Sequence, residues 1–380
     1  MRIAYFAHFA GGSDGASAMD ADFLAALRAQ GHDVTVLSPF AKPETGRVAG
    51  DISAARLARL VLAIPGYTRM ALAGLRLARD PDRRIVSQYH VFHPATFVAF
   101  VVARLRSRPL IVRAHDPLPG SYRGSAQGAM FRGGFRLYRR VLRHPRTWTM
   151  VPSRELRAVV GDSLGLSAER VLVVPNNVTP MSLPNPDDVA RLRTSLGLEG
   201  RRVVLQFGSF TDAGTRTFVE ALHLLGRPEV VGLILADPWR TAQFTRLAAA
   251  SGIADRLIAP GPQPYARLNA FLTLADVCVG ILSADPIAIG SMPRSTMEAM
   301  AFGKPVVLAR DVSSASLVDA GRNCVAVPPG DPASLASAIA RILEDPALAA
   351  ALGSRARETA GKFRSDAVAR SFTAALDGIP

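Results

Sequence analysis

Hydrophobic and polar positions at the start of the chain follow two different periods. The run from Arg2 to Phe9 is mostly apolar and aromatic, which is typical of a short buried strand. The next segment, Met19 to Gln30, has apolar residues three and four positions apart, and Gly31 stands where a helix commonly ends. Val34 to Leu37 is again strand-like. The opening therefore predicts a βαβ unit, with a parallel sheet and a right-handed crossover.

The same alternation of strand and helix continues along the chain. A polar stretch rich in Pro and Asn, from Pro175 to Asp188, separates two series of strand patterns. These are Arg84 to Ser87, Leu110 to Ala114, Trp148 to Val151 and Val171 to Val174 before it, and Val203 to Phe207, Val230 to Leu235, Val277 to Leu282, Pro305 to Leu308 and Cys324 to Val327 after it. A last helix is expected over Ser365 to Leu376. The pattern predicts two α/β sheets in tandem, joined near residues 179 to 198.

Length and composition agree with two domains. The chain has 380 residues, 49% hydrophobic and 20% charged, which is enough for two cores of ordinary size. The longest apolar stretches, such as Ala95 to Ala103, reach about half of the ~20 residues that a membrane-spanning helix needs. Met1 leads directly into the first strand pattern, without a signal peptide. Cys278 and Cys324 lie in apolar strand runs and lack metal-site spacing, so we expect a cytoplasmic protein with buried cysteines.

Positive charge is concentrated in the first half of the chain. Residues 1–178 hold 25 Lys and Arg against 12 Asp and Glu, whereas residues 179–380 hold 20 against 19. The segment from Val101 to Thr147 alone carries eleven arginines and one acidic residue, Asp116. Such a field favours an anionic partner: a phosphorylated ligand, an anionic membrane surface or nucleic acid. A solvated arginine-rich face without a partner is the alternative.

Two loops after predicted strands have residues suited to a ligand. Gly11 and Gly12 follow the first strand, where missing side chains let a ligand approach the backbone and the next helix offers N–H groups to an anion. A tight turn would explain this pair equally well. Together with Gly15 they do not form the dinucleotide fingerprint, which argues against a nicotinamide enzyme. The second loop, Pro175 to Val178, includes Asn176 and also suits a simple linker turn.

The segment from Met292 to Val307 is the strongest candidate for ligand chemistry. Pro293 suits the start of a helix and Gly303 its end, which places Glu298 about one turn into that helix. A carboxylate there can accept two hydrogen bonds from vicinal hydroxyls such as those of a ribose, while the helix N-terminus and Arg294 face a phosphate. An exposed helix glutamate without a ligand is the alternative.

Four segments carry a resemblance to a known family. They are Pro293 to Val307, Val325 to Pro332, Val174 to Val178, and the opening with Gly11-Gly12 and Gly31 to Val36. They follow one another along the chain in the family's order, and over essentially the whole chain they resemble the family 4 glycosyltransferases of the GT-B fold. These enzymes transfer a sugar from a nucleotide sugar with retention at the anomeric carbon.

The resemblance implies an α/β, GT-B architecture of two Rossmann-like domains facing across a cleft. The N-terminal domain, residues 1–178, would bind the acceptor. The C-terminal domain, residues 179–364, would bind the nucleotide-sugar donor. The last helix, residues 365–380, would return to the N-terminal domain.

The resemblance also assigns roles to residues. Glu298 matches the second glutamate of the family's two-glutamate motif, which holds the ribose hydroxyls. Gly11 and Gly12 match the glycine loop near the diphosphate and the reacting centre. His115, which follows a strand, resembles the histidine that contacts the donor sugar, although a core histidine is equally compatible with its place. The donor-binding residues expected are Glu298, Arg294, Arg216, Gly208, Gly290, Ser291, Met292 and Asn176.

Two departures from the family pattern fall in the donor-binding half. The first motif glutamate would stand at position 290, where this chain has Gly290, and Asp285 is the nearest carboxylate upstream. The pair of diphosphate-binding cations would stand within Gly208 to Gly214, which holds neither; we expect Arg216 and Arg294 to replace them. Some members with a Pro-x-x-x-x-Glu motif resemble this chain better, so we interpret the departures as divergence. No Asp-x-Asp metal motif stands in a family-like place, and no metal or other cofactor is expected.

These observations predict a retaining glycosyltransferase of the hexosyltransferase type that uses a UDP- or GDP-sugar. The acceptor expected is a hydroxyl of a lipid-linked sugar or saccharide at the cytoplasmic face of the membrane, as in polysaccharide biosynthesis. A soluble small-molecule acceptor is the alternative. A GT-B relative of another type, namely a nucleotide-sugar epimerase, a phosphorylase or a non-catalytic binding protein, comes next. Nucleic acid is not expected, because the basic run has few interleaved aromatics and matches no recognition module.

Peripheral attachment to an anionic membrane is expected from the arginine-rich segment. Its apolar side chains can form a stripe beside arginines, as in an interfacial basic helix. The residues are Phe131, Phe135, Leu137, Val141 and Leu142, with Arg132, Arg136, Arg139, Arg140 and Arg143. In the competing interpretation, the apolar stripe packs on the sheet and the arginines are exposed only to water.

Overall fold

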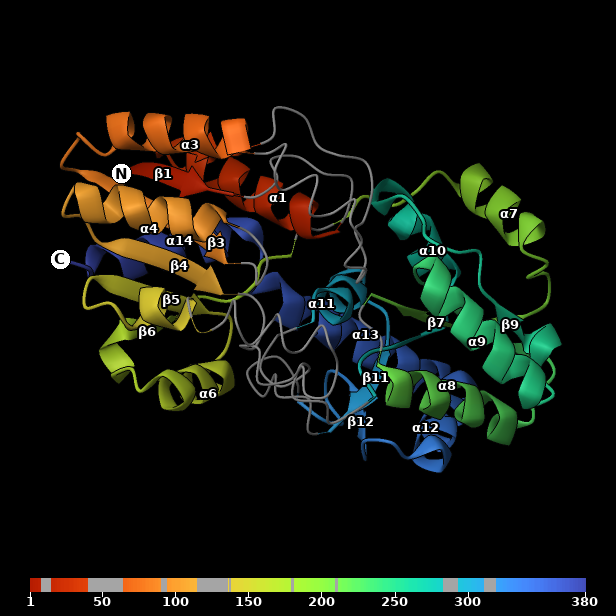
Figure 1. The fold of residues 1–380 in the computed structure, drawn as a ribbon. Coiled ribbons are helices and arrows are strands. Elements are labelled where there is room, and N and C mark those ends of the chain that lie inside the picture. The colour runs from red at the N-terminus through yellow and green to blue at the C-terminus, as the bar shows by residue number, and fades with distance from the viewer. Residues whose placement is uncertain are drawn as a thin grey trace. The chain divides into compact units, whose positions relative to one another are not determined.

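The computed structural model describes residues 1–7, 15–39, 64–89, 94–114, 136, 138–178, 181–208, 211–282, 293–310 and 319–380. Its contacts divide the chain into two compact units. The N-terminal unit comprises Met1–Asn177 and Ser365–Pro380, and the C-terminal unit comprises Val178–Arg364. Each unit has its own parallel sheet with helices on both faces (Figure 1).

The sheet of the N-terminal unit has six strands in the order β2-β1-β3-β4-β5-β6. They are β1 (Arg2–Phe6), β2 (Asp33–Leu37), β3 (Arg83–Tyr89), β4 (Leu110–Ala114), β5 (Thr147–Val151) and β6 (Val171–Val173). Every neighbouring pair is parallel. Central strands such as β4 are buried on both faces, which is why they are almost continuously apolar in sequence.

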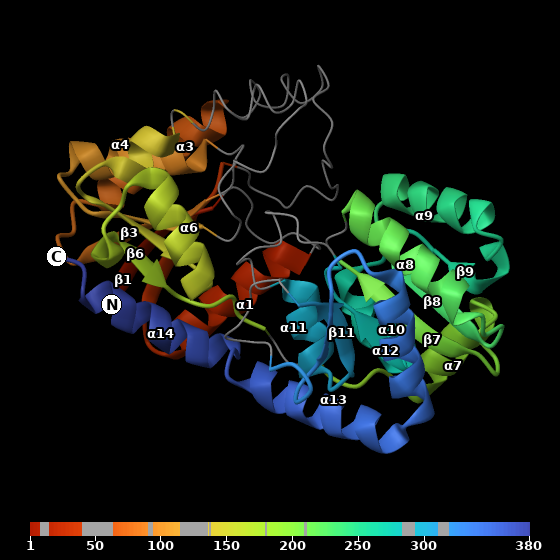
Figure 2. The same ribbon diagram turned by 90° about the horizontal axis from the view of Figure 1, so that it is seen from below.

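Helices cover both faces of this sheet (Figure 2). One face carries α1 (Gly15–Ala29) and α14 (Ser365–Asp377), whose Phe23 and Phe372 rings meet edge to face with centroids 5.1 Å apart. The other carries α3 (Ile64–Leu77), α4 (Ala95–Leu105), the helical residues 138–143 and α6 (Arg154–Leu164). The last helix of the chain therefore completes the core of the N-terminal unit.

The sheet of the C-terminal unit also has six parallel strands, in the order β12-β11-β10-β7-β8-β9. They are β7 (Arg202–Phe207), β8 (Val230–Leu235), β9 (Leu257–Ile258), β10 (Val277–Val279), β11 (Val306–Ala309) and β12 (Val325–Val327). The chain builds outward from β7 to β9 and then returns to the other side of β7 with β10. Ligands of open α/β sheets bind at such a switch point, beyond the carboxyl ends of the strands.

Two helical layers enclose this second sheet. One face packs against α7 (Pro186–Ser195), α10 (Leu268–Leu274), α11 (Arg294–Ala301) and α13 (Pro346–Gly361). The other packs against α8 (Asp212–Leu225), α9 (Pro238–Ala250) and α12 (Pro332–Glu344). Several of these helices begin where a polar side chain accepts a hydrogen bond from a first-turn N–H, as Thr211 does for α8 and Asp237 for α9.

The α/β fold class predicted from the sequence is confirmed, and each predicted strand has a counterpart. One strand, β9, was not predicted, because its two residues, Leu257 and Ile258, are too few to give a pattern. Both cysteines are free and buried, as expected. Gly31 and Gly303 have φ of +82° and +79°, which fits the helix ends predicted there.

The apolar stripe predicted for a membrane is partly wrong. Val141 and Leu142, of the helical residues 138–143, are buried in the core with strand residues of the sheet, so these two side chains pack on the protein. Arg136, Arg139, Arg140 and Arg143 are exposed. The remaining stripe residues Phe131, Arg132, Phe135 and Leu137 lie outside the described residues.

Candidate functional site

The end of β7 lies directly against the start of α11. Gly208 follows β7 with a φ of +94°, a left-handed conformation that favours glycine. A Cβ at this position would lie 2.6 Å from Oγ and 2.7 Å from Cβ of Ser295, in the first turn of α11. The close contact between the end of β7 and the first turn of α11 therefore requires glycine at position 208. It places the exposed backbone of Gly208 at the switch point, beside the N-terminus of α11.

The end of β10 approaches the same turn from the other side of the switch point. A Cβ on Gly280 would lie 3.0 Å from Oγ1 of Thr296. The buried Gln206 Nε2 of β7 donates to the Gly280 carbonyl oxygen at 3.2 Å and ties the two strand ends together. The N-cap of α11 is Pro293, whose ring offers no acceptor to the first N–H groups of the helix. Such N–H groups are suited to an anion.

A buried carboxylate stands one turn further along α11. Glu298 is only 3% exposed. Its Oε1 accepts a hydrogen bond from Tyr265 Oη at 2.7 Å and from Arg294 Nε at 2.5 Å. Arg294 Nη2 in turn donates to Tyr265 Oη at 2.6 Å. We call these three residues the Glu298 cluster.

The surroundings of Tyr265 in the Glu298 cluster keep its phenol neutral. The Arg294 guanidinium lies over the Tyr265 ring, 4.7 Å from its centroid, and its side chain is 14% exposed. Burial, and then the negative charge of Glu298, raise the pKa of Tyr265 well above its usual value. The phenol therefore remains a hydrogen-bond donor at neutral and moderately alkaline pH. Arg294 Nη1 is buried and has no hydrogen-bond partner among the described residues.

This arrangement can recognise a polar ligand with both hydroxyl and anionic groups. A held carboxylate accepts hydrogen bonds from hydroxyls, and a carboxylate is the natural acceptor for a vicinal pair. The N-terminus of α11, the backbone at Gly208 and the spare Nη1 of Arg294 favour negative charge nearby. No group of three or more His, Cys, Asp or Glu that could hold a metal ion occurs in the described parts of the chain.

The other predicted site residues are distributed differently. Arg216 is exposed on the second turn of α8, where its charge helps to lower the pKa of Asp212, after the larger effect of the hydrogen bond from Arg240. Asn176 is 6% exposed and belongs to the N-terminal unit. The remaining predicted site residues, Gly11, Gly12, His115, Gly290, Ser291 and Met292, lie outside the described residues. The structure thus brings Glu298, Arg294 and Gly208 to one edge of the C-terminal sheet.

Sequence reasoning missed Tyr265. It begins a short 3-10 helix, Tyr265–Arg267, and reaches α11 from 33 positions earlier in the chain. Nothing in the local pattern Pro264-Tyr265 points to a carboxylate partner. The only available signal was the place of this turn after an edge strand of the C-terminal sheet, on the side of the strands' carboxyl ends.

A second polar cluster, which the sequence did not predict, is buried in the N-terminal unit. Arg113 of β4 is 3% exposed, and its Nη1 donates to Tyr5 Oη at 3.1 Å and lies 3.6 Å from Asp20 Oδ1. Tyr5 Oη lies 3.4 Å from the same Asp20 oxygen. We call these three residues the Asp20 cluster. Arg113 was expected in a basic field facing an anionic partner; burial under α1 corrects that expectation.

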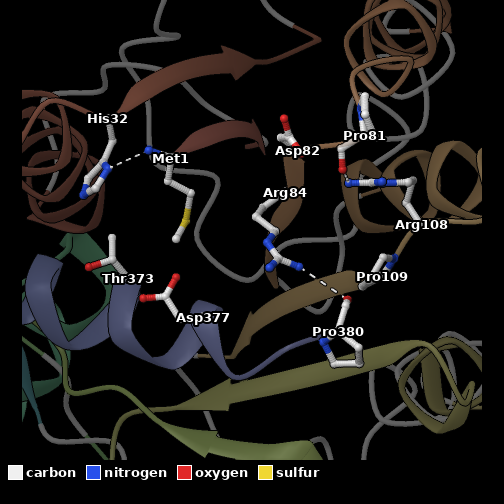
Figure 3. Close-up of a pocket in the computed structure, with 10 residues that line it drawn as sticks. All are labelled: Met1, His32, Pro81, Asp82, Arg84, Arg108, Pro109, Thr373, Asp377 and Pro380. Atoms are coloured by element: carbon white, nitrogen blue, oxygen red, sulfur yellow. Dashed lines mark hydrogen bonds between the residues drawn. The ribbon is translucent and has the colours of Figure 1, made fainter.

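A pocket of about 650 Å³ lies elsewhere on the N-terminal unit, at the amino ends of its strands (Figure 3). Arg84, Arg108, His32 and Asp377 are among its lining residues, and none of the predicted site residues is. Burial is the first cause that lowers the pKa of His32 there.

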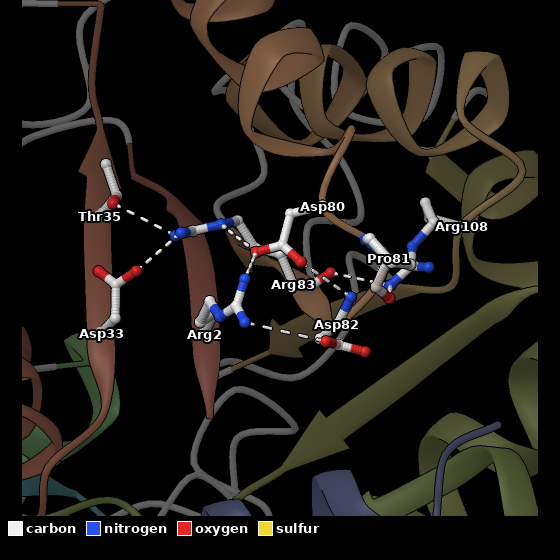
Figure 4. Close-up of polar contacts among 8 residues, drawn as sticks. All are labelled: Arg2, Asp33, Thr35, Asp80, Pro81, Asp82, Arg83 and Arg108. Atoms are coloured by element: carbon white, nitrogen blue, oxygen red, sulfur yellow. Dashed lines mark hydrogen bonds and ion pairs between the residues drawn. The ribbon is translucent and has the colours of Figure 1, made fainter.

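Polar contacts beside that pocket join the first residues of three strands (Figure 4). Arg83 Nη2 of β3 donates to Asp33 Oδ2 of β2 at 2.7 Å, and Arg2 Nη1 of β1 donates to Asp80 Oδ2 at 2.7 Å. Since ligands of open α/β sheets bind at the opposite edge, we interpret this network as a structural tie.

Two glycosyltransferase family models match the two halves of the chain. The family described as "Glycosyltransferase Family 4" matches residues 14–180, and "Glycosyl transferases group 1" matches residues 201–345. Among curated proteins, the chain is 33% identical over 238 residues to a D-inositol 3-phosphate glycosyltransferase of Acidothermus cellulolyticus, covering 58% of this chain and 49% of the relative. It is 29% identical over 196 residues to the 2-deoxystreptamine glucosyltransferase of Streptomyces kanamyceticus, covering 50% and 49%. The chain spans about half the length of these curated relatives.

Solved structures share the fold over the full length. HepE of Anabaena, in complex with UDP and glucose, has a TM-score of 0.73 at 19% identity and covers 99% of both chains. The sucrose-phosphate synthase of Thermosynechococcus elongatus has a TM-score of 0.74 at 21% identity and covers 99% and 98%. The common fold is the GT-B fold, and together with the two family matches it identifies the chain as a family 4-like glycosyltransferase of that fold.

Proposed function

We propose that the protein is a retaining glycosyltransferase. It moves a sugar from a nucleoside diphosphate sugar to a hydroxyl of a lipid-linked or saccharide acceptor at the cytoplasmic face of the membrane. The observation that carries this proposal is the buried Glu298 carboxylate on α11, next to the close approach of Gly208 and Ser295 at the switch point. A carboxylate for hydroxyls beside an anion-favouring backbone is what a nucleoside diphosphate requires.

The donor is held mainly by the C-terminal unit in this proposal. Glu298 accepts hydrogen bonds from the ribose hydroxyls, and Arg294 Nη1 with the N-terminus of α11 faces the diphosphate. Arg216, on the helix that follows Gly208, adds positive charge. Gly290, Ser291 and Met292 precede α11 in the chain and complete the donor site. HepE has been solved with UDP-glucose, and one relative is described as GDP-mannose-dependent, which supports a UDP- or GDP-sugar.

The chemistry proposed needs no enzymic nucleophile. The bond from the anomeric carbon to the diphosphate oxygen breaks, and the acceptor hydroxyl oxygen forms the new bond on the same face. The hydroxyl proton passes to an oxygen of the departing diphosphate, which carries away the bonding pair. The protein contributes preorganised positive charge at the leaving group. No metal is needed for this step.

The N-terminal unit supplies the acceptor side. Strands β1 and β4 end at the same edge of their sheet, separated by β3. Gly11 and Gly12 follow β1 in sequence, and His115 follows β4 directly. We assign these three residues to the reacting centre on the resemblance to the family. Asn176, at the boundary between the units, is assigned to the donor in the same way.

Attachment to an anionic membrane is supported by two neighbouring helices of the N-terminal unit. Helices α3 and α4 pack side by side and contain no acidic residue (Figure 2). Leu72, Val101 and Leu105 are 54%, 51% and 66% exposed. Exposed arginines accompany them, namely Arg69, Arg76 and Arg104. Among the described residues, no helix is both long enough and apolar enough to span a bilayer.

A soluble acceptor is the second candidate. The curated relatives include a D-inositol 3-phosphate glycosyltransferase and a 2-deoxystreptamine glucosyltransferase, whose names state small polar acceptors. The donor site proposed above serves either acceptor equally.

Sedimentation with liposomes distinguishes the membrane-bound acceptor from the soluble one. If the protein attaches to a membrane, it should sediment with anionic but not with neutral liposomes, and salt should release it, because each arginine near an anionic surface contributes ~1 kcal/mol. A protein that stays in the supernatant with both kinds of vesicle favours the soluble acceptor.

Incubation with a panel of nucleotide sugars tests the proposal as a whole. Slow hydrolysis or transfer to a supplied acceptor should release free nucleoside diphosphate from one donor in the panel, with the anomeric configuration of the product retained. Isomerised nucleotide sugar would indicate an epimerase, and phosphate-dependent release of sugar phosphate would indicate a phosphorylase. Tight binding without any turnover would indicate a non-catalytic binding protein.

A further inference from the structure

Tyr265 joins two parts of the C-terminal unit that are far apart in sequence. It follows Pro264 at the start of a 3-10 turn beyond the edge strand β9, and its side chain is partly buried. Its hydroxyl lies against the first turns of α11, on the side chains of Arg294 and Glu298. A tyrosine that only filled space would not need its hydroxyl between two charged groups.

The hydroxyl closes a ring of three hydrogen bonds. A phenol has one hydrogen to donate and lone pairs to accept. Here the hydrogen goes to Glu298 Oε1 at 2.7 Å, and the oxygen accepts from Arg294 Nη2 at 2.6 Å. Arg294 Nε reaches the same Glu298 oxygen at 2.5 Å. The carboxylate is therefore fixed from two directions, which a pair of residues four positions apart on one helix would not achieve alone.

We propose that Tyr265 is a positioning residue for ribose recognition, which holds the Glu298 carboxylate in the orientation that accepts the ribose hydroxyls. The inference rests on the proposed role of Glu298 in donor binding. It makes Tyr265 a determinant of specificity for ribonucleotides, acting through Glu298. The raised pKa of Tyr265 keeps its hydroxyl protonated, so that this donor is available throughout the neutral range.

The rival explanation is that Tyr265 contributes only its ring, either to the core or by packing on Arg294. The conservative variant Tyr265→Phe separates the two, because it keeps the ring and removes the hydroxyl. Tyr5→Phe is the matched control, since it removes a hydroxyl from the corresponding place in the Asp20 cluster. Both variants are compared with the wild-type full chain.

The test is calorimetric binding of two ligands: the nucleoside diphosphate that the wild type prefers, and its analogue without ribose hydroxyls. The wild type should bind the ribonucleotide at least about tenfold more tightly, as expected for hydrogen bonds to a charged group. Tyr265→Phe should weaken the ribonucleotide about five- to tenfold and leave the analogue unchanged, whereas Tyr5→Phe should change neither.

Equal weakening of both ligands by Tyr265→Phe, or no weakening of either, would overturn the positioning role. A wild type that does not distinguish the two ligands would instead overturn the role of Glu298 itself. The two failures are therefore distinguishable in the same titrations.

Discussion

Each unit of the molecule holds an arginine against a buried carboxylate and a tyrosine hydroxyl, but the contact distances differ between the two clusters. In the Asp20 cluster, the guanidinium, carboxylate and phenol are separated by 3.1, 3.4 and 3.6 Å. In the Glu298 cluster the corresponding contacts are 2.6, 2.7 and 2.5 Å. The same three chemical groups thus form a loose arrangement in one sheet and a tight one in the other.

The surroundings explain the difference. The Arg113 guanidinium lies 3.9 Å from the centroid of Phe23 and 5.7 Å from that of Phe372, so rings from α1 and α14 enclose it. Arg294 is the first residue of α11, is 14% exposed, and keeps Nη1 without a partner among the described residues. A charge enclosed by rings stabilises packing, whereas a buried donor left without a partner at a switch point indicates that a further polar group is to be bound there. We infer that the Asp20 cluster is structural and the Glu298 cluster functional.

The largest expected effect comes from Arg113→Ala. It would leave the Asp20 carboxylate buried beside Tyr5 without its cation, and breaking a buried pair in this way typically costs ~3 to 5 kcal/mol. Urea denaturation should show this loss of unfolding free energy in the transition of the N-terminal unit. Calorimetry on the folded fraction should show unchanged nucleotide affinity. A variant of normal stability that binds nucleotide poorly would reverse the roles of the two clusters.

The matched control replaces the whole ion pair. The double variant Asp20→Leu with Arg113→Met removes both charges, and well-packed apolar replacements of buried pairs are often neutral or stabilising. It should therefore recover most of the stability that Arg113→Ala loses. Failure to recover would mean that the rings of Phe23 and Phe372 need the guanidinium itself.

The elements of the fold could be predicted from the sequence because their signals are local. Apolar runs such as Val230 to Leu235 give β8 with the predicted bounds, and glycines such as Gly31 mark helix ends. Glu298 and Arg294 could be proposed for a similar reason, since they lie four positions apart in one predicted helix. The strand β9 has only two residues and gives no such signal.

The partners of buried charges could not be predicted, because they depend on tertiary distance. Asp20 and Arg113 are more than ninety positions apart, and only the stacking of α1 on the sheet brings them together. Tyr265 and Glu298 likewise meet because a turn after β9 faces α11. The count of arginines between Val101 and Thr147 also included Arg113 in the basic field expected to face a partner. A sequence alone does not show which cations are buried and which are exposed to solvent.

The second largest effect is expected from Glu298→Gln, which should weaken the binding of the donor nucleotide. The substitution keeps the size of the side chain and removes its charge, and the loss of a charged hydrogen-bond partner typically costs ~1.5 to 3 kcal/mol, or about ten- to a hundredfold in affinity. Titration with the preferred nucleoside diphosphate measures it. Asp20→Asn is the matched change in the other cluster and should leave this affinity unaltered. Wild-type affinity in a folded Glu298→Gln protein would remove the ribose assignment.

A smaller and more specific effect is expected from Arg294→Ala. Loss of its hold on Glu298 should weaken nucleoside mono- and diphosphates alike, since both carry the ribose. Loss of Nη1 should weaken the diphosphate further, by about five- to tenfold, as expected for one charge-assisted hydrogen bond. The ratio of the two dissociation constants is therefore the measurement. An unchanged ratio would mean that Arg294 acts only on Glu298 and Tyr265.

The smallest expected effect is that of Tyr5→Phe on stability. The neutral hydroxyl makes contacts of 3.1 and 3.4 Å, and Asp20 and Arg113 still face each other at 3.6 Å without it, so the loss should be about 1 kcal/mol. Burial is the first cause that raises the pKa of Tyr5 above its usual value of 10.0. The unfolded chain ionises at lower pH than the folded one, so this tyrosine destabilises the fold as pH rises above about 10. The variant should therefore lose less stability than wild type between pH 9 and pH 11, in denaturation curves measured at each pH. An equal alkaline decline in both proteins would show that the Tyr5 hydroxyl is not enclosed as the Asp20 cluster requires.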